Sequence, residues 1–126
     1  MVFNLKPSEV TFRNLTPHEV TLCIDDGQNI TYPVDGPPPR VTTIENTDGF
    51  LHDDVNDLDV EVVVRSLSST VTDLPAPKPG VILIVSRMTC EAKSQRTDLV
   101  YPEGIVRSPD NTPIGCRKFG RIRPTG

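Results

Sequence analysis

Thirteen of the 126 residues are proline, and they are spread along the chain. Proline lacks a backbone N–H, and its ring clashes within a helix interior, so a helical bundle is disfavoured. The length suits one domain, residues 1–126, with a single core. Because only 5% of residues are aromatic and Trp is absent, valine, leucine and isoleucine must supply that core. Such a core is thin for this length, and oligomerisation would help to stabilise it.

Alternating polar and apolar residues, rich in β-branched side chains, predict several strands. The expected strands are residues 9–12, 19–24, 29–34, 40–45, 59–66, 81–85 and 114–119. The valine-rich run 59–66 is the strongest candidate for a central strand, and the wholly apolar run 81–85 indicates a strand buried on both faces. We therefore expect a mainly β (α+β) protein, with an antiparallel sheet or β-sandwich core containing these two runs.

The remaining segments are expected to be one helix and several loops. Residues 87–95 tolerate a helix of about two turns, and the hydroxyl of Ser86 can cap it by accepting a free N–H. Residues 46–58, rich in Asn, Asp and Gly, predict a loop. Residues 96–109 also predict a loop, with a brief extended stretch at 105–106.

Charge is distributed unevenly along the chain. Residues 1–86 carry five basic and thirteen acidic side chains, a net charge of −8, whereas residues 87–126 carry eight basic and four acidic ones, a net +4. The acidic part disfavours binding along a long nucleic acid, which requires many phosphate contacts. The basic part could hold one small anion; alternatively, folding evens out the surface charge.

Cysteine spacing and hydropathy favour a reduced, cytoplasmic protein. The three cysteines are too far apart for a CxxC metal site, and their odd number does not fit a disulfide framework. Cys23 and Cys90 lie in apolar patterns that predict burial, whereas Cys116 adjoins basic residues that favour a thiolate. No apolar run reaches the roughly 18 residues of a membrane span, and the N-terminus does not resemble a signal peptide. With only two histidines and scattered cysteines, no metal site is expected.

The first candidate for chemistry is the segment Asn14-Leu15-Thr16-Pro17-His18, directly before a predicted strand. Its residue types suit a turn that directs a side chain. His18 could carry a proton or anchor a ligand, and a hydrolase that uses His18 with a cysteine is formally possible. Alternatively, Thr16 and His18 tie the turn together through hydrogen bonds.

The second candidate is a pair of similar segments, Arg96-Thr97-Asp98 and Arg107-Ser108-Pro109-Asp110. Arginine presents a planar fork of donors that matches phosphate or carboxylate, and aspartate can accept from ribose hydroxyls. Together with Arg117, they could form one anion site of nucleotide size; alternatively, each Arg–Asp pair fastens its own loop. No dinucleotide-binding or P-loop motif is present, and no cofactor is expected.

An ordered set of segments carries a resemblance to a known family: Asn14–Val20, Ile84–Ser86, Arg96–Val100, Val106–Arg107 and Ile114–Arg117. It resembles small proteins common in phages and prophages that open with an "NLTPH"-like stretch and close with a "VRD…G.IIGCR"-like one. The resemblance covers about residues 12–119. Ser108 departs from it, because the family often has Asp there, although Asp110 could substitute.

That family is similar, in size and in its late arginine-rich loops, to Thoeris anti-defence proteins that sequester cyclic ADP-ribose-type signals. The resemblance implies a β-rich homo-oligomer, a sponge that traps a cyclic nucleotide without cleaving it. It implies that Arg96 and Arg107 bind phosphates, while Asp98 and Asn14 contact sugar or base. The alternative is a non-enzymatic protein-interaction module that uses the acidic segment 46–58 and the proline-rich turns as contact surfaces.

Overall fold

The structure is a computed structural model that describes residues 9–24 and 27–123, with the side chains of 67–69 left aside. Within these residues the chain forms eight strands and one α-helix. In chain order these are β1 (Thr11–Asn14), β2 (Val20–Cys23), β3 (Asn29–Tyr32), β4 (Arg40–Asp53), β5 (Leu58–Thr72), β6 (Val81–Ile84), α1 (Arg87–Ala92), β7 (Leu99–Arg107) and β8 (Pro113–Gly120). The expected fold class, mainly β with one short helix, is confirmed.

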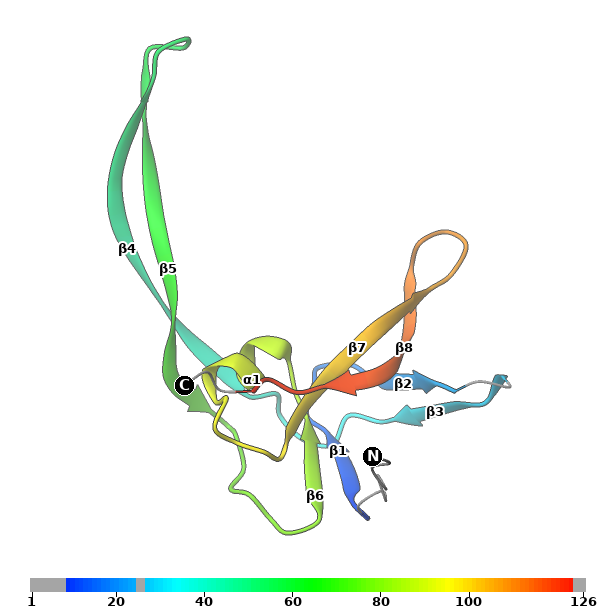
Figure 1. Cartoon of the computed structure of the whole chain (residues 1–126). Helices are drawn as coiled ribbons and strands as arrows, with labels where there is room; N and C mark the ends of the chain where they lie inside the picture. The colour runs from blue at the N-terminus through cyan, green and yellow to red at the C-terminus, as the bar shows by residue number, and fades with distance from the viewer. Residues whose placement is uncertain (1–8, 25–26, 124–126) are drawn as a thin grey trace, which may run out of the picture.

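Six strands form one mixed sheet in the order β1-β6-β7-β8-β2-β3 (Figure 1). The predicted hairpin of β2 and β3 is confirmed, with Val20 opposite Tyr32. β7 and β8 also pair antiparallel, whereas β6 runs parallel to both β1 and β7. The parallel pairing of β6 with β7 follows from the chain path, because α1 carries the chain from the end of β6 back to the start of β7.

The core lies on both sides of β6. Leu83 and Val85 face one cluster, which includes Leu15, Cys90 and Leu99. Ile84 faces a second cluster with Val20, Val100 and Cys116, against which the rings of Phe12, Tyr32 and Phe119 pack. Successive side chains of a strand point to opposite faces, and only a strand covered on both sides can be apolar throughout. The predicted burial of the run 81–85 on both faces is confirmed at its C-terminal half, where Leu83 and Ile84 are 2% and 0% exposed.

The short helix begins as predicted and ends earlier. Ser86 caps it by accepting a hydrogen bond from the backbone N–H of Thr89 at 3.2 Å. The last helical residue is Ala92 rather than Gln95, and residues 93–95 form turns. The first strand is also displaced from its predicted range and covers Thr11–Asn14.

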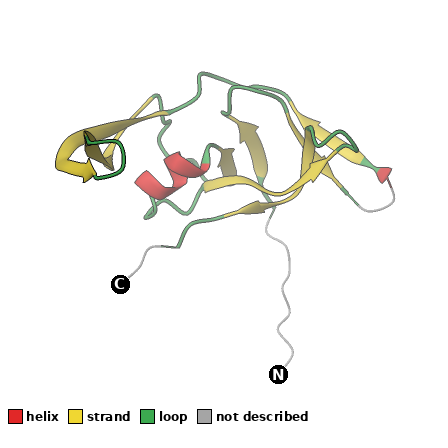
Figure 2. Ribbon diagram, turned by 90° about the horizontal axis from the view of Figure 1, so that it is seen from above, coloured by secondary structure: helices red, strands yellow, loops and turns green. Residues whose placement is uncertain are grey.

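The largest correction concerns residues 40–72. The predicted loop 46–58 is wrong: β4 continues to Asp53, four residues turn, and β5 begins at Leu58. Asn, Asp and Gly lower strand propensity, but pairing with the valine-rich β5 outweighs it. The prediction that 59–66 belongs to the central core is also wrong. β4 and β5 form a separate two-stranded hairpin, hereafter the arm, which extends away from the six-stranded sheet and contacts α1 (Figures 1 and 2).

The predicted loop 96–109 is likewise wrong from Leu99 onward, where the nine-residue strand β7 begins. Pro102 and Gly104 made this segment look like a loop. Gly104 does adopt a positive φ of 66°, but pairing with β6 and β8 and burial of Leu99 and Val100 hold the segment in the sheet. The 108–112 turn consequently lies at the far end of the β7–β8 hairpin from α1 (Figure 1).

Candidate functional site

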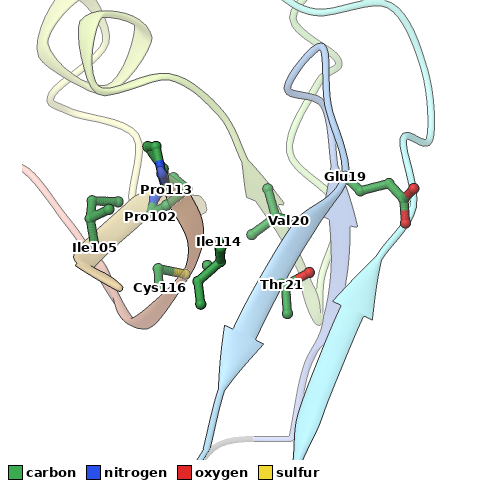
Figure 3. Close-up of a pocket in the computed structure, with 9 residues that line it drawn as sticks. Glu19, Val20, Thr21, Pro102, Ile105, Pro113, Ile114 and Cys116 are labelled. Carbon is green, nitrogen blue, oxygen red and sulfur yellow. The ribbon is translucent and has the colours of Figure 1, made fainter. Parts of the chain in front are cut away.

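A pocket of about 230 Å³ opens between β2 and β8. The one register pair that joins the two strands is Leu22 with Cys116, and Gly115 also lies close to the backbone of Thr21. The pocket is lined by Glu19, Val20, Thr21, Pro102, Ile105, Pro113, Ile114, Gly115 and Cys116 (Figure 3). Sequence reasoning missed this pocket, because its lining residues come from strands that are far apart in the chain and leave no local motif.

The walls of the pocket are mainly apolar. Ile105 and Ile114 are 50% and 53% exposed, and both line the pocket. Thr21 contributes a hydroxyl, which lies 3.1 Å from the hydroxyl of Thr31. Glu19 lines the entrance, and Figure 3 shows its carboxylate extending away from Ile114. The pocket can therefore accept a flat apolar group and offer it few polar contacts.

Arg107 stands beside this pocket at the end of β7. It is the register partner of Pro113, a residue of the pocket wall. Its guanidinium is exposed and donates to the backbone carbonyl of Asn111 at 3.2 Å. That acceptor is neutral, and in the described part of the chain no carboxylate pairs with Arg107. Its positive charge therefore remains available at the rim.

Asp110 is not the partner of Arg107. Its carboxylate accepts hydrogen bonds from the hydroxyl of Ser108 and from the backbone N–H of Thr112. These bonds hold the pKa of Asp110 below its usual value. Of the two arrangements that the sequence left open for Arg107, the ion pair with Asp110 is not formed within the described residues.

Arg117 lies on β8 directly after Cys116, and its side chain is exposed. Its β-carbon lies against Gly104, where an added Cβ would approach it to 3.5 Å. Together with Lys118 and Arg121 it makes the β7–β8 hairpin positively charged. The predicted site residues Arg107 and Arg117 thus share one hairpin.

Arg96 and Asp98 form an ion pair in the turn before β7. Arg96 donates through Nε and Nη2 to the two carboxylate oxygens, both at 2.7 Å, and also to the carbonyl of Pro75 at 2.9 Å. The side chains are only 20% and 12% exposed. Hydrogen bonding to the partner lowers the pKa of Asp98 and raises the pKa of Arg96. This matches the alternative in which an Arg–Asp pair fastens its own loop.

Arg96 and Arg107 do not meet within one chain. At about 3.3 Å per residue, the nine residues of β7 separate them by roughly 26 Å. A loop that folds back and brings both to one anion was expected, and this arrangement is wrong because the loop is a strand. Only two different copies of the chain could bring both arginines to one ligand.

Asn14 is the centre of the turn that precedes β2. It is 1% exposed, and its carbonyl oxygen accepts from the backbone N–H (2.9 Å) and hydroxyl (2.7 Å) of Thr16. Its amide donates to the carbonyls of His18 (2.8 Å) and Tyr32 (2.9 Å). The structure therefore brings Asn14, Thr16 and His18 together. The imidazole of His18 is exposed.

The cysteines depart in part from expectation. Cys90 is buried as predicted, and desolvation raises the pKa of its thiol to about 11. Cys23 is only half-buried, so its predicted burial is wrong. The thiolate-favouring setting expected at Cys116 is also wrong, because this residue is 1% exposed and burial raises the pKa of its thiol. Its basic neighbours in the sequence, Arg117 and Lys118, are exposed instead.

Across residues 9–24 and 27–123, no group of three or more histidine, cysteine or acidic side chains is arranged to hold a metal ion. In the same ranges, no helix has the length and apolar character needed to cross a bilayer. No family model matches the chain, and no curated protein or solved structure matches it either.

Proposed function

We propose that the protein is a non-catalytic binding protein that sequesters a small anionic ligand, a cyclic nucleotide-type signal, in the pocket between β2 and β8. One observation carries the proposal: an apolar pocket of about 230 Å³ lies beside Arg107, an exposed arginine whose charge no carboxylate in the described residues neutralises. A nucleotide combines the same two features, a flat base and a charged phosphate.

The base would lie against Ile105 and Ile114, which stay half-exposed in the unliganded protein. The phosphate would bind Arg107, whose planar fork can donate two parallel hydrogen bonds to its oxygens. Arg96 is a poor second phosphate ligand in the same chain, because Asp98 already occupies its fork.

Retention of the ligand in intact form is supported by the state of the nearest thiol. Cys116 lines the pocket, but burial raises the pKa of its thiol, and the thiol rather than the nucleophilic thiolate is present near neutral pH. The anti-defence role and the cytoplasmic location follow from the resemblance and the sequence, and they belong to this proposal.

The test is binding followed by recovery. The protein is incubated with a panel of linear and cyclic nucleotides, the affinity is measured by calorimetry, and the bound fraction is denatured and analysed by mass spectrometry. Recovery of unaltered ligand supports sequestration, whereas a new product indicates an enzyme. Retention of no nucleotide at any concentration tested would contradict the proposal.

Arg107 provides the discriminating variants. Losing a bidentate phosphate contact should weaken binding about tenfold or more, because hydrogen bonds to charged groups contribute roughly 1.5–3 kcal/mol. Arg107→Lys keeps the charge without the fork and should bind more weakly than the parent protein. The matched control is Arg121→Ala, because Arg121 is an exposed arginine directly after the end of β8. Equal affinities for Arg107→Ala and the parent protein would remove Arg107 from the site.

A second candidate function, a protein-interaction module, is favoured by the arm. The segment 46–58 expected as an acidic contact surface lies at its end, where residues 45–61 hold seven acidic side chains and no lysine or arginine. The nucleotide panel separates the two functions, because an interaction module retains no nucleotide.

A further inference from the structure

The arm has two chemically different faces. Register partners in an antiparallel pair lie on the same face, and alternate residues along β5 change face. One face carries three side-chain contacts across the hairpin: Arg65 with Glu45 at 3.2 Å, Glu61 with Thr47 at 2.8 Å, and Asp59 with His52 at 2.7 Å. We call this the polar face of the arm.

The opposite face is apolar. Between Leu58 and Ser66 it carries the even-numbered residues of β5 and their partners on β4. Most are apolar (Ile44, Leu51, Leu58, Val60, Val62 and Val64), and they stand beside Asn46, Gly49 and Ser66. Ile44, Leu51, Leu58, Val60 and Val64 are between 45% and 67% exposed. The one charged residue on this face, Asp53, lies at the tip, where its carboxylate accepts three hydrogen bonds from Val55 and Asn56. Between Ile44 and Leu51 the register partners on this face carry no charge, and Asp48 lies at the bulge between Thr47 and Gly49.

A two-stranded ribbon is marginally stable in water by itself, and contiguous exposed apolar side chains mark an interaction surface. The accessible surface of this chain is larger than that of a typical folded monomer of the same mass. Its accessible surface is 9437 Å², whereas a folded monomer of 13.9 kDa exposes about 6,700 Å². Assigning the thirteen undescribed residues the roughly 160 Å² of a fully extended residue still leaves an excess of about 660 Å². A standard interface buries about 800 Å² per partner.

Charge decides which occupant fits. The basic β7–β8 hairpin of another copy would be attracted to the acidic polar face and would leave the apolar face uncovered. Two copies of the apolar face have the same length and no charged register partners between Ile44 and Leu51, and packing them together keeps both acidic faces in solvent. Symmetric pairing through identical surfaces is also the commonest form of soluble assembly.

We infer that the apolar face of the arm binds the apolar face of the arm of a second copy of this chain, giving a homodimer. Two hairpins packed face to face form a small sandwich with its layers about 10 Å apart. This inference is independent of the proposed ligand site, because the arm contributes no residue to the pocket.

The arm itself offers matched variants for the test. Leu51 and Phe50 are adjacent on β4 and equally exposed, at 67%, but lie on the apolar and polar faces respectively. Val64 and Val63 form a second such pair, at 49% and 38%. Leu51→Thr and Val64→Lys therefore change the proposed interface, while Phe50→Thr and Val63→Lys make the same changes on the other side of the ribbon.

Mass is measured by sedimentation equilibrium on the full chain over a concentration series. We expect a dimer for the parent protein and an unchanged dimer for Phe50→Thr and Val63→Lys. For Leu51→Thr and Val64→Lys we expect the dissociation constant of the dimer to rise at least tenfold. Circular dichroism of each variant shows whether the protein remains folded. If the lysine variants unfold, the comparison of Leu51→Thr with Phe50→Thr provides the test. A monomeric parent protein overturns the inference, and so does an assembly that responds equally to changes on both faces or to neither.

Discussion

Arg96 joins two separate parts of the chain: its fork holds the carboxylate of Asp98 at 2.7 Å while Nη2 also donates to the carbonyl of Pro75 at 2.9 Å. The pair therefore fastens the proline-rich turn before β6 to the turn before β7. An arginine used in this way stabilises the fold, and its contribution can be measured separately from any ligand.

Replacing Asp98 by Asn should destabilise the protein in a pH-dependent manner. Its pKa is lower in the folded protein than the usual value of about 3.8, so the stabilisation is present above that value and is lost as the pH falls through the folded pKa. We expect a loss of about 1.5–3 kcal/mol in the free energy of unfolding at pH 7, and a smaller difference near pH 3. Urea unfolding at both pH values checks this. Asp48→Asn, at an exposed bulge of β4, should change stability by less than about 0.5 kcal/mol. An equal loss at pH 7 and pH 3 would contradict the assigned role of the ion pair.

Asn14→Ala should be among the most destabilising changes of a polar residue. The substitution removes the side-chain partner of the carbonyl of Tyr32 and of the N–H of Thr16, and one of the two donors to the carbonyl of His18, in a part-buried setting. We expect a loss of about 2–4 kcal/mol. Thermal melts followed by circular dichroism give the measurement. Asn29→Ala, exposed at the start of β3, is the control and should melt close to the parent protein. If Asn14→Ala retains full stability and loses only ligand affinity, Asn14 is a ligand contact instead.

The three cysteines should react with a thiol reagent in a fixed order. Cys23 is half-buried and should react first, whereas Cys90 and Cys116 are buried with raised pKa values and should react slowly in the folded protein. Mass spectrometry after timed labelling at pH 7.5 assigns each site. Labelling in denaturant, where all three should react rapidly, is the control. Rapid reaction of Cys116 in the folded protein would restore the possibility of a nucleophilic thiol.

Gly115→Ala should push β2 away from β8. A Cβ at this position would lie 2.7 Å from the sulfur of Cys23 and 2.8 Å from the backbone oxygen of Thr21. We expect a loss of about 1–3 kcal/mol of stability, measured by urea unfolding. Combining it with Cys23→Ala should recover only part of the loss, because the contact with the backbone remains. Full recovery in the double variant would show that the strands are not held as closely as described.

Local sequence patterns were sufficient to predict the structure of segments whose contacts depend on residues nearby in the chain. The apolar run 81–85 could only be a strand covered on both faces, and Ser86 could cap the helix that follows. The β2–β3 hairpin was predictable for the same reason, since its alternation and its turn lie next to each other in the chain. In the candidate site, the sequence identified the basic β7–β8 segment and the Asn14–His18 turn, but not the pocket or the roles of their side chains.

Tertiary structure decided the rest, because pairing energy between distant segments outweighs local propensity. Residues 46–53 have the composition of a loop but are held as a strand by β5, and residues 99–107 are held by β6 and β8. The extended β7 places Arg96 and Arg107 at opposite ends of a strand, so one chain cannot unite them. The sequence by itself determined a mainly β domain with a buried β6 and a basic C-terminal hairpin. Which valines enter the core and which remain on an exposed arm depended on long-range pairing, which no window of the sequence records.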